Sequence, residues 1–431
     1  MSEYLIQGDT LTGIADAIRE KVGSSDGIDP AQMAELIKGI QSGGGAPVVE
    51  KEVNFYDYDG TLLYSYTVAE AQALTELPAG PEHEGLIFQG WNWSLESVKA
   101  LTRAMNIGAL YTTDDGTTRL YIHLEEGRTS PMLGVCPNGT VTVDWGDGTT
   151  PDTLTGTSTS GLGAKTPVHD YAEPGDYVIR LIVASGKFGL SGNVKGVLKG
   201  EYNDNAYKNA VRRVELGDNV SLGNSAFDSC LSLKSVTFPD REGVFLSSSV
   251  TGAFQYCSAL AFLSIPKDAN VGDYFAASCY ALKAISLPPK VLNNVMGSNA
   301  FYSCALLDSL TIPDGITSIG ASFLAMTEAI LSVDLPDSVN ILPNRFVEGS
   351  SSLVRFKVKS SVVDVGSATF RNCAPLAYVD FSELSVIPTL SSTYAFNGLS
   401  SDFEIRVPAA LYDEWIAATN WSTYASQIVA V

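Results

Sequence analysis

Histidines and paired aspartates are the residues of this 431-residue sequence whose types and spacing could perform chemistry. They are His83, His123, His169, Asp57 with Asp59, and Asp144 with Asp147. An imidazole can move protons or bind a metal, and paired carboxylates can hold calcium or catalyse glycoside hydrolysis. Each aspartate pair, however, flanks a glycine in a short turn and lacks the twelve-residue calcium-loop pattern. A structural role in turns is therefore the favoured interpretation.

No catalytic motif accompanies these residues. The sequence has no Gly-x-Ser-x-Gly nucleophile elbow, no glycine-rich phosphate loop with lysine and no His-Glu-x-x-His pair. A carboxylate pair across a cleft stays open as an alternative, because 48 residues are acidic. We predict a protein that is not an enzyme and that has no cofactor or metal site. Its receptor-binding residues cannot be named from the sequence.

Five of the six cysteines stand at one position of a recurring phrase. Complete copies read Ala-Phe-x-x-Cys-x-x-Leu, and a proline follows nine residues after Cys230, Cys257 and Cys304. Degenerate copies continue the series at Cys279, Phe323, Phe346, Cys373 and Phe396. About eight units therefore recur, one every 22 to 27 residues.

The repeated position of the cysteines predicts free thiols in small buried slots. Paired disulfides would need two geometries in each repeat, and equivalent positions do not suggest them. Cys136 is isolated in the sequence. No Cys-x-x-Cys or mixed Cys/His spacing indicates zinc.

A period of this length predicts a solenoid, because each unit is too small to bury its own apolar side and must stack on its neighbours. Residues 235–238 alternate polar and apolar, which predicts a short strand with one buried face that ends at Pro239. The repeated phrase resembles the leucine-rich repeats of the BspA-like family over roughly residues 205–410. The resemblance implies a leucine-rich-repeat solenoid, placed here at residues 189–410, with an aromatic C-terminal cap at residues 411–431.

The first 47 residues show helical periodicity followed by a hinge. Apolar residues recur at helical spacing over residues 10–42, and Asp29 with Pro30 is a strong helix start. Two helices of about 12 residues cannot bury their apolar faces alone. Residues 1–42 are therefore predicted to be a helical attachment element, with packing on the next domain as the alternative. Residues 43–47, rich in glycine, form a flexible hinge by composition.

Two β modules are predicted after the hinge. Residues 48–115 contain two strands around Asp59-Gly60, a helical segment from Thr67 to Leu77, and a Gly-x-x-Phe-x-Gly-Trp strand. These features resemble the internalin-type B repeat, and the resemblance implies a β-grasp-like fold.

The second β module is predicted at residues 116–188. It has a strand over residues 118–124, the phrase Asp-Trp-Gly-Asp-Gly-Thr at residues 144–149, and a His-x-Tyr-x-x-Pro-Gly-x-Tyr phrase from His169. The pair of phrases resembles the PKD domain, which implies an immunoglobulin-like β-sandwich in which His169 hydrogen-bonds a neighbouring turn. The predicted fold class is thus multidomain and mainly β, with a short helical pair at the N-terminus.

Composition and net charge limit the classes of partner that the protein is expected to bind. Hydrophobic residues make up 45% and charged residues 17% of the sequence, which is typical of a folded protein. The net charge of −21 repels phosphate backbones and anionic lipids, so neither nucleic acid nor a membrane is expected as a partner. The N-terminus lacks the pattern of a secretion signal and no segment is long and apolar enough for a membrane helix, so synthesis in the bacterial cytoplasm is expected.

The β modules are kinds that bacterial surface proteins use for adhesion and spacing, whereas the expected cytoplasmic synthesis suits a virion protein. The chain opens with Glu3-Tyr4-Leu5-Ile6-Gln7, followed by an apolar-patterned segment from Thr10 to Arg19 and by Met33-Ala34-x-x-Ile37. These residues resemble the start of tail proteins from phages of gut Firmicutes. We therefore expect a phage tail fibre or receptor-binding protein of the virion, with β modules as a stalk. It would bind tail or baseplate proteins through residues 1–42, possess a solenoid that binds a host-surface glycan or protein, and could form a homotrimer. A bacterial cell-surface adhesin and a virion decoration protein that binds neighbouring subunits are the alternatives.

Overall fold

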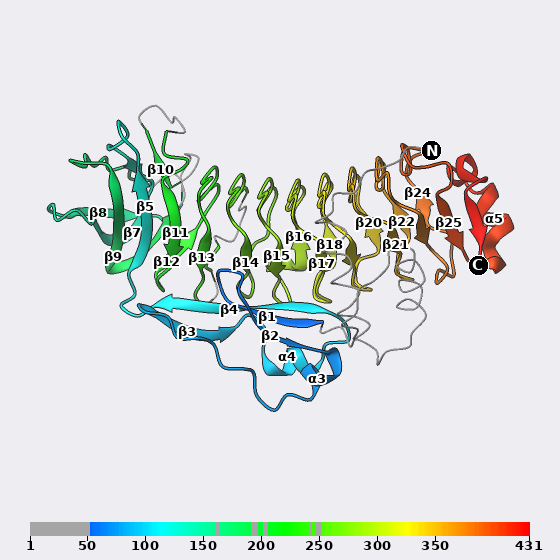
Figure 1. Ribbon diagram of the computed structural model, residues 1–431, viewed down its shortest axis with the longest axis horizontal. Coiled ribbons are helices and arrows are strands. Elements are labelled where there is room, and N and C mark those ends of the chain that lie inside the picture. The colour runs from blue at the N-terminus through cyan, green and yellow to red at the C-terminus, as the bar shows by residue number, and fades with distance from the viewer. Residues whose placement is uncertain (1–51, 161–163, 191–196, 201–205, 242, 246–250) are drawn as a thin grey trace, which may run out of the picture. The chain divides into compact units, whose positions relative to one another are not determined.

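The structure is a computed structural model that describes residues 52–160, 164–190, 197–200, 206–241, 243–245 and 251–431. The chain divides into two compact units, Met1–Lys51 and Glu52–Val431. The predicted helical pair of residues 1–42 and the hinge at residues 43–47 lie outside the described residues. The second unit is mainly β and consists of a small mixed sheet, a larger sheet and a β-solenoid (Figure 1).

Residues 52–115 form a four-stranded sheet of order β2-β1-β4-β3, in which β1 and β4 are parallel. Its elements are β1 (Val53–Tyr56), β2 (Leu62–Tyr66), α3 (Val68–Gln72), β3 (Leu86–Trp91), α4 (Leu95–Lys99) and β4 (Met105–Thr113). The predicted turn at Asp59-Gly60 joins β1 to β2, and Gly60 takes the left-handed φ of 91° there. The predicted helix from Thr67 begins with a capping box between Thr67 and Glu70, but it ends at Gln72. The assignment to a β-grasp stays a prediction.

The larger sheet has the order β13-β11-β5-β9-β7-β8. Its strands, with those that pair beside it, are β5 (Thr118–Leu124), β6 (Met132–Leu133), β7 (Cys136–Asp144), β8 (Asp152–Thr157), β9 (Gly175–Leu190), β10 (Leu198–Lys199), β11 (Val211–Glu215), β12 (Val220–Leu222) and β13 (Ser235–Thr237). The predicted strand over residues 118–124 is confirmed as β5, and the alternating residues after Gly175 lie in β9. The PKD assignment stays a prediction.

The larger sheet continues into the solenoid without a break at residue 188. Strand β9 crosses that position, and β11 pairs antiparallel with β5 on one side and parallel with β13 on the other. The backbone of the predicted β-sandwich region therefore supplies hydrogen bonds to the first strand of the solenoid. An exposed solenoid end would otherwise leave such groups unpaired.

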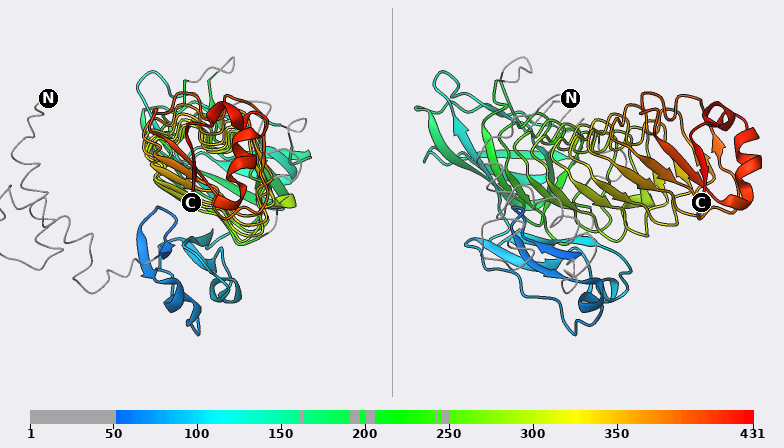
Figure 2. Two further views of the ribbon diagram at one scale, coloured as in Figure 1. Left: turned by 90° about the vertical axis from the view of Figure 1, so that its right-hand side faces the viewer. Right: turned by 45° about the vertical axis from the view of Figure 1, so that its right-hand side comes forward.

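The solenoid has two sets of short parallel strands. The first set continues from β13 through β14 (Phe262–Ser264), β15 (Ala284–Ser286), β17 (Ser309–Thr311), β19 (Ser332–Asp334), β21 (Arg355–Lys357), β23 (Tyr378–Asp380), β25 (Glu404–Val407) and β26 (Ile428–Ala430). The second comprises β12, β16 (Val295–Met296), β18 (Ser318–Ile319), β20 (Ile341–Leu342), β22 (Asp364–Val365) and β24 (Thr389–Leu390). In the left view of Figure 2 the successive coils lie behind one another, as a stack of equivalent repeats requires.

The phenylalanines form a ladder through the solenoid core, but they alternate between two adjacent positions. The backbone N–H of Phe301 donates to the carbonyl of Phe323, and that of Leu324 donates to Phe346. The same bond in other repeats runs from Phe to Ala, so Phe323 and Phe346 occupy the position of alanine in the phrase, and Leu324 the position of phenylalanine. One large side chain per repeat fills the core from either position.

All six cysteines are free and buried, as the sequence predicts. The thiol of Cys257 donates to the carbonyl oxygen of Phe227 in the preceding repeat at 3.1 Å, and Cys279 and Cys304 make the equivalent bonds. Burial raises the pKa of Cys304 to about 12. The repeated cysteine thus fills a small slot and satisfies a backbone carbonyl between coils.

The C-terminal segment covers the last coil. It contains η4 (Ala409–Leu411), α5 (Tyr412–Ala417) and η5 (Trp421–Tyr424), and β26 extends the sheet beside β25. Trp415 and Trp421 are fully buried and contact Phe381, and the indole N–H of Trp421 donates to the carbonyl of Pro388. Residues 409–431 therefore cover apolar core at the end of the solenoid, as the aromatic composition of that segment predicts.

Candidate recognition surface

The aspartates considered for chemistry lie in turns or, for Asp144, at the strand end that leads into one. Asp59 accepts a hydrogen bond from the backbone of Thr61, and Asp144 accepts one from Gly146. Asp57 is buried and contacts Nε2 of His83 at 2.7 Å. These contacts confirm the predicted structural role in turns. Within the described ranges, no cluster of three or more His, Cys, Asp or Glu could hold a metal ion.

His169 contacts a turn, as its phrase predicts. Its Nε2 lies 2.8 Å from Oδ2 of Asp147, and its ring stacks on Trp145 with centroids 4.7 Å apart. Partial burial raises the pKa of Asp147, but hydrogen bonds from the Thr149 and His169 side chains and from the Thr149 backbone more than offset it and lower that pKa to about 2. The arrangement fastens the Asp-Trp-Gly-Asp-Gly-Thr turn and leaves the imidazole enclosed rather than facing a cleft.

His123 is also paired with an aspartate, through a 2.8 Å contact between Nδ1 and Asp176. All three histidines therefore contact aspartates from their own module, at separate places in the fold. The structure brings His83 onto Asp57 and His169 onto Asp147, but it does not gather these pairs into one site. In the described part of the chain, no helix has both the length and the apolar character needed to cross a bilayer.

The solenoid itself presents a surface made by its first set of strands. We call it the outer strand face and define it by the first and third residues of β13, β14, β15, β17, β19, β21, β23 and β25. The middle residues of these strands, such as Leu310, Phe356 and Val379, are buried in the core. The first and third residues point away from the core, because side chains alternate along a strand.

Residues 52–115 cover the outer strand face at β13, β14 and β15. Strand β4 lies against β13, β14 and β15, and the backbone N–H of Tyr111 donates to the carbonyl of Phe238 (Figure 1). The buried side-chain amide of Asn92 donates to the carbonyl of Ile265 and to Ser286 Oγ, and the indole of Trp93 donates to Leu287. Asn92 and Trp93 are therefore satisfied although they are buried, whereas Ser264 Oγ at the same contact has no hydrogen-bond partner among the described residues.

Small side chains allow the close approach of β4. A Cβ atom added at Gly108 would lie 2.1 Å from Ser264 Oγ and 3.0 Å from Ser286 Cβ. Thr237, Ser264 and Ser286 are all buried beneath the module. The expectation of one buried face in the repeat strands is therefore incomplete, since β13 is buried on both faces. The predicted stalk also differs from the structure, because this module packs against the side of the solenoid instead of spacing it.

Arg103 marks the boundary of the covered part, because its contacts lie just after β17 and in β19. Its guanidinium donates to the carbonyl of Ile312 and contacts Asp314 at 2.5 Å and Asp334 at 3.3 Å. Beyond it, the outer strand face changes character. Its first and third residues become Ser332, Asp334, Arg355, Lys357, Tyr378, Asp380, Glu404 and Arg406. We call this second part, over β19 to β25, the open strand face.

A depression of about 480 Å³ lies on the open strand face. It is lined by Leu331, Ser332, Val333, Arg355, Phe356, Lys357, Tyr378 and Asp380. Its volume is within the range of small-ligand sites. Leu331 is 59% exposed and Val354 50% exposed beside it, so apolar and charged groups share the same patch.

Charged side chains on the open strand face are mostly paired. Lys357 contacts Glu383 at 2.7 Å, and Lys359 contacts Asp334 at 3.0 Å. The Arg406 guanidinium lies 3.7 Å from the centroid of the Tyr378 ring. Arg355 is exposed, and among the described residues it has neither a side-chain hydrogen bond nor an ion pair.

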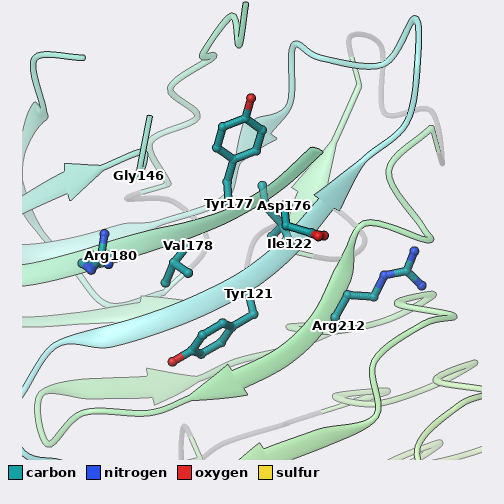
Figure 3. Close-up of a pocket in the computed structure, with 8 residues that line it drawn as sticks. All are labelled: Tyr121, Ile122, Gly146, Asp176, Tyr177, Val178, Arg180 and Arg212. Atoms are coloured by element: carbon teal, nitrogen blue, oxygen red, sulfur yellow. The ribbon is translucent and has the colours of Figure 1, made fainter. Parts of the chain in front are cut away.

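A second depression, of about 380 Å³, lies on the outer surface of β5 and β9 (Figure 3). Figure 3 shows the rings of Tyr121 and Tyr177 pointing in opposite directions. Arg180 contacts Asp144, and Asp176 is paired with His123. The polar groups of this depression do not converge, so the open strand face is the stronger candidate for a binding site.

Sequence reasoning did not find the open strand face. The strand positions can be read from the repeated phrase, and Arg355, Lys357 and Tyr378 follow earlier repeats in which most of these positions hold serine or threonine. The change from small to large side chains at these strand positions is a feature of the sequence that could have indicated the open strand face. The docking of β4 on the earlier repeats, which singles out the later ones as open, is not visible in the sequence.

Comparison with known proteins identifies the repeats. Residues 202–295 and 294–411 match the BspA type leucine rich repeat region in six copies. No curated protein matches the chain. A solved leucine-rich repeat protein from Bacteroides ovatus is 25% identical, with a TM-score of 0.36, over 49% of this chain and 62% of its own. A leucine rich cell surface protein from Faecalibacterium prausnitzii is 18% identical, with a TM-score of 0.26, over 49% of this chain and 72% of its own. The chain therefore contains a β-solenoid of BspA-type leucine-rich repeats.

Proposed function

We propose that this protein is a non-enzymatic adhesin that recognises a cell surface through the open strand face. One observation carries the proposal. Where β4 covers the outer strand face, its residues are small apart from Phe262, and Thr237, Ser264 and Ser286 are buried; where the described chain leaves the face uncovered, large charged and aromatic residues surround a depression. Exposed aromatic and arginine side chains beside an apolar patch are typical of recognition surfaces.

We propose more specifically that the protein is part of a phage tail. This finer proposal rests on the likeness of residues 1–42 to tail proteins of phages of gut Firmicutes. On this account residues 1–42 bind tail or baseplate proteins, the solenoid binds a glycan or protein of the host surface, and the protein resides in the virion. Oligomerisation through residues 1–42, for which a homotrimer is the model, is tested by light scattering of the intact protein at micromolar concentration, where a monomer would count against it.

Labelling with the full-length protein tests this function. Fluorescent protein is incubated with a panel of gut Firmicutes cells and with purified phage tails, and the variant Tyr378→Ala is compared with Tyr280→Ala. Tyr378 is half-buried, whereas Tyr280 is exposed and lies in a turn of an earlier repeat. Cell labelling that Tyr378→Ala reduces and Tyr280→Ala preserves supports recognition through the open strand face. Equal labelling by both variants contradicts it.

The same experiment distinguishes a phage tail protein from a bacterial adhesin and from a virion decoration protein. Labelling of tails as well as cells supports the tail protein. If the protein labels cells but not tails, a bacterial adhesin is favoured. If it labels tails and Tyr378→Ala abolishes this labelling, a decoration protein whose solenoid binds neighbouring subunits is favoured.

A further inference from the structure

We infer that the depression on the open strand face binds a carboxylated sugar residue of a surface polysaccharide. This inference rests on the proposed function and names the class of ligand. Three features of the depression support it. The Arg355 guanidinium has no acidic partner among the described residues, the Tyr378 ring is contacted by Arg406 on one side, and the paired strands admit a compact ligand rather than a peptide strand.

Arg355 supplies the charge selectivity. The protein carries 48 acidic and 27 basic residues, so an anionic ligand needs a local cation that no acidic residue occupies. Of the exposed arginines in the described chain, Arg128 and Arg345 pair with Glu125 and Glu348, whereas Arg355 has no acidic partner. The nearby Lys357 and Lys359 are engaged by Glu383 and Asp334. A planar guanidinium binds a carboxylate through two parallel hydrogen bonds, which makes Arg355 the natural partner of an anionic group.

Tyr378 supplies a platform for a sugar ring. Its Cα is paired in register with that of Arg355 on the neighbouring strand. Arg406 lies over the Tyr378 ring from β25, on the next strand, and holds it by a cation–π contact. An aromatic surface packs against the C–H face of a sugar, while Ser332 and Asp380 in the same lining offer a hydroxyl and a carboxylate to sugar hydroxyl groups.

The sheet excludes recognition of a peptide by strand addition at this place. Strand β23 is hydrogen-bonded to β21 on one side and β25 on the other. Peptide strands add to a free sheet edge, whereas the depression opens on the face of the sheet. A ligand there must be bound by side chains, and the volume of about 480 Å³ suits one or two sugar units.

Binding of purified polysaccharides to the full-length protein tests the inference. The probes are polygalacturonate, hyaluronate and polysialic acid, each compared with its methyl-esterified form, which keeps the sugar and removes the charge. We expect at least one carboxylated probe to bind and its ester to bind at least tenfold more weakly. Arg355→Ala should weaken that binding by about tenfold or more, because a hydrogen bond to a charged group is among the stronger ones, and Arg355→Lys should weaken it by less because the charge remains.

Arg345→Ala is the matched control, because it removes the same exposed charge from the same repeat at a turn. Equal loss in Arg345→Ala and Arg355→Ala overturns the inference, and so does equal binding of the esters or no binding of any of the three probes. If the wild-type protein labels cells in a Tyr378-dependent manner but binds none of the probes, the inference fails and the proposed function stands. If it labels no cells, the proposed function fails.

Discussion

At the residue scale, buried polar groups link neighbouring coils and fasten single turns. The thiols of Cys257, Cys279 and Cys304 each donate to a carbonyl of the preceding repeat. Desolvation raises the pKa of these thiols, because the charged thiolate is disfavoured away from water. Asp147 shows the opposite shift, since hydrogen bonds to its carboxylate stabilise the charged form.

The thiols are predicted to be unreactive in the folded protein. At pH 8 a disulfide-exchange reagent such as Ellman's reagent should label none of the six cysteines of the native protein within minutes, because all six are buried and nucleophilic attack requires an accessible thiolate. The same assay in denaturant, the internal control, should count six thiols. Rapid native labelling of more than one thiol would show that the slots are open to solvent.

Asp147 is predicted to make stability depend on pH below 4. Its folded pKa of about 2 lies below the ordinary 3.8, so its contribution is complete above pH 4 and is lost as the pH falls towards 2. The shift corresponds to about 2 kcal/mol for this largely enclosed carboxylate. Urea unfolding between pH 5 and 2.5 should show a smaller loss of stability for Asp147→Asn than for the wild type. The exposed neighbour Asp170 serves as the control, and Asp170→Asn should follow the wild type.

At the element scale, repeats are interchangeable units, and β4 distinguishes some from others. Its docking needs glycine and serine at the contact, whereas the core of each repeat needs one large side chain at either of two adjacent positions. The strands, the repeat period and the buried cysteines follow from local patterns and could be predicted from the sequence. The exchange of the Phe and Ala positions and the burial of both faces of β13 could not be predicted from the sequence, because they depend on contacts between distant segments.

Gly108→Ala is predicted to weaken the docking of β4. The added methyl group would overlap Ser264, and overpacking of this kind costs about 1–3 kcal/mol. Urea unfolding should show this loss, and hydrogen exchange of β4 amides should become faster. Gly134→Ala is the control, because its added Cβ would meet its nearest neighbour, the Val197 carbonyl oxygen, at 3.9 Å. Equal stability of the two variants would contradict a tight interface.

A swap within one repeat tests the two-position core. Phe275→Ala is predicted to cost about 3–5 kcal/mol of unfolding free energy by leaving a cavity, and Ala276→Phe about 1–3 kcal/mol by overpacking. Both residues are fully buried. The double variant restores the Ala-Phe order of the complete copies, so its cost should fall well below the sum measured for the single variants. Additive costs would show that the two positions do not share one space.

At the scale of the whole molecule, the open strand face results from how the modules combine. Residues 52–115 cover the outer strand face at β13 to β15, and the described C-terminal residues cover the last coil. The repeats between them keep an outward row of charged and aromatic side chains. Sequence patterns could place the solenoid and its cap, but they could not assign binding residues, because exposed solenoid positions carry no periodic constraint of their own.

Blocking the open strand face through a surface cysteine tests whether this face binds the cell surface. Because the native thiols are buried, Ser332→Cys can be coupled selectively to a maleimide polyethylene glycol of about 5 kDa, with the exposed turn residue Ser351→Cys as the control. We expect that coupling at residue 332 abolishes labelling of cells and that coupling at residue 351 preserves it. Full labelling by the protein blocked at residue 332 would contradict the claim.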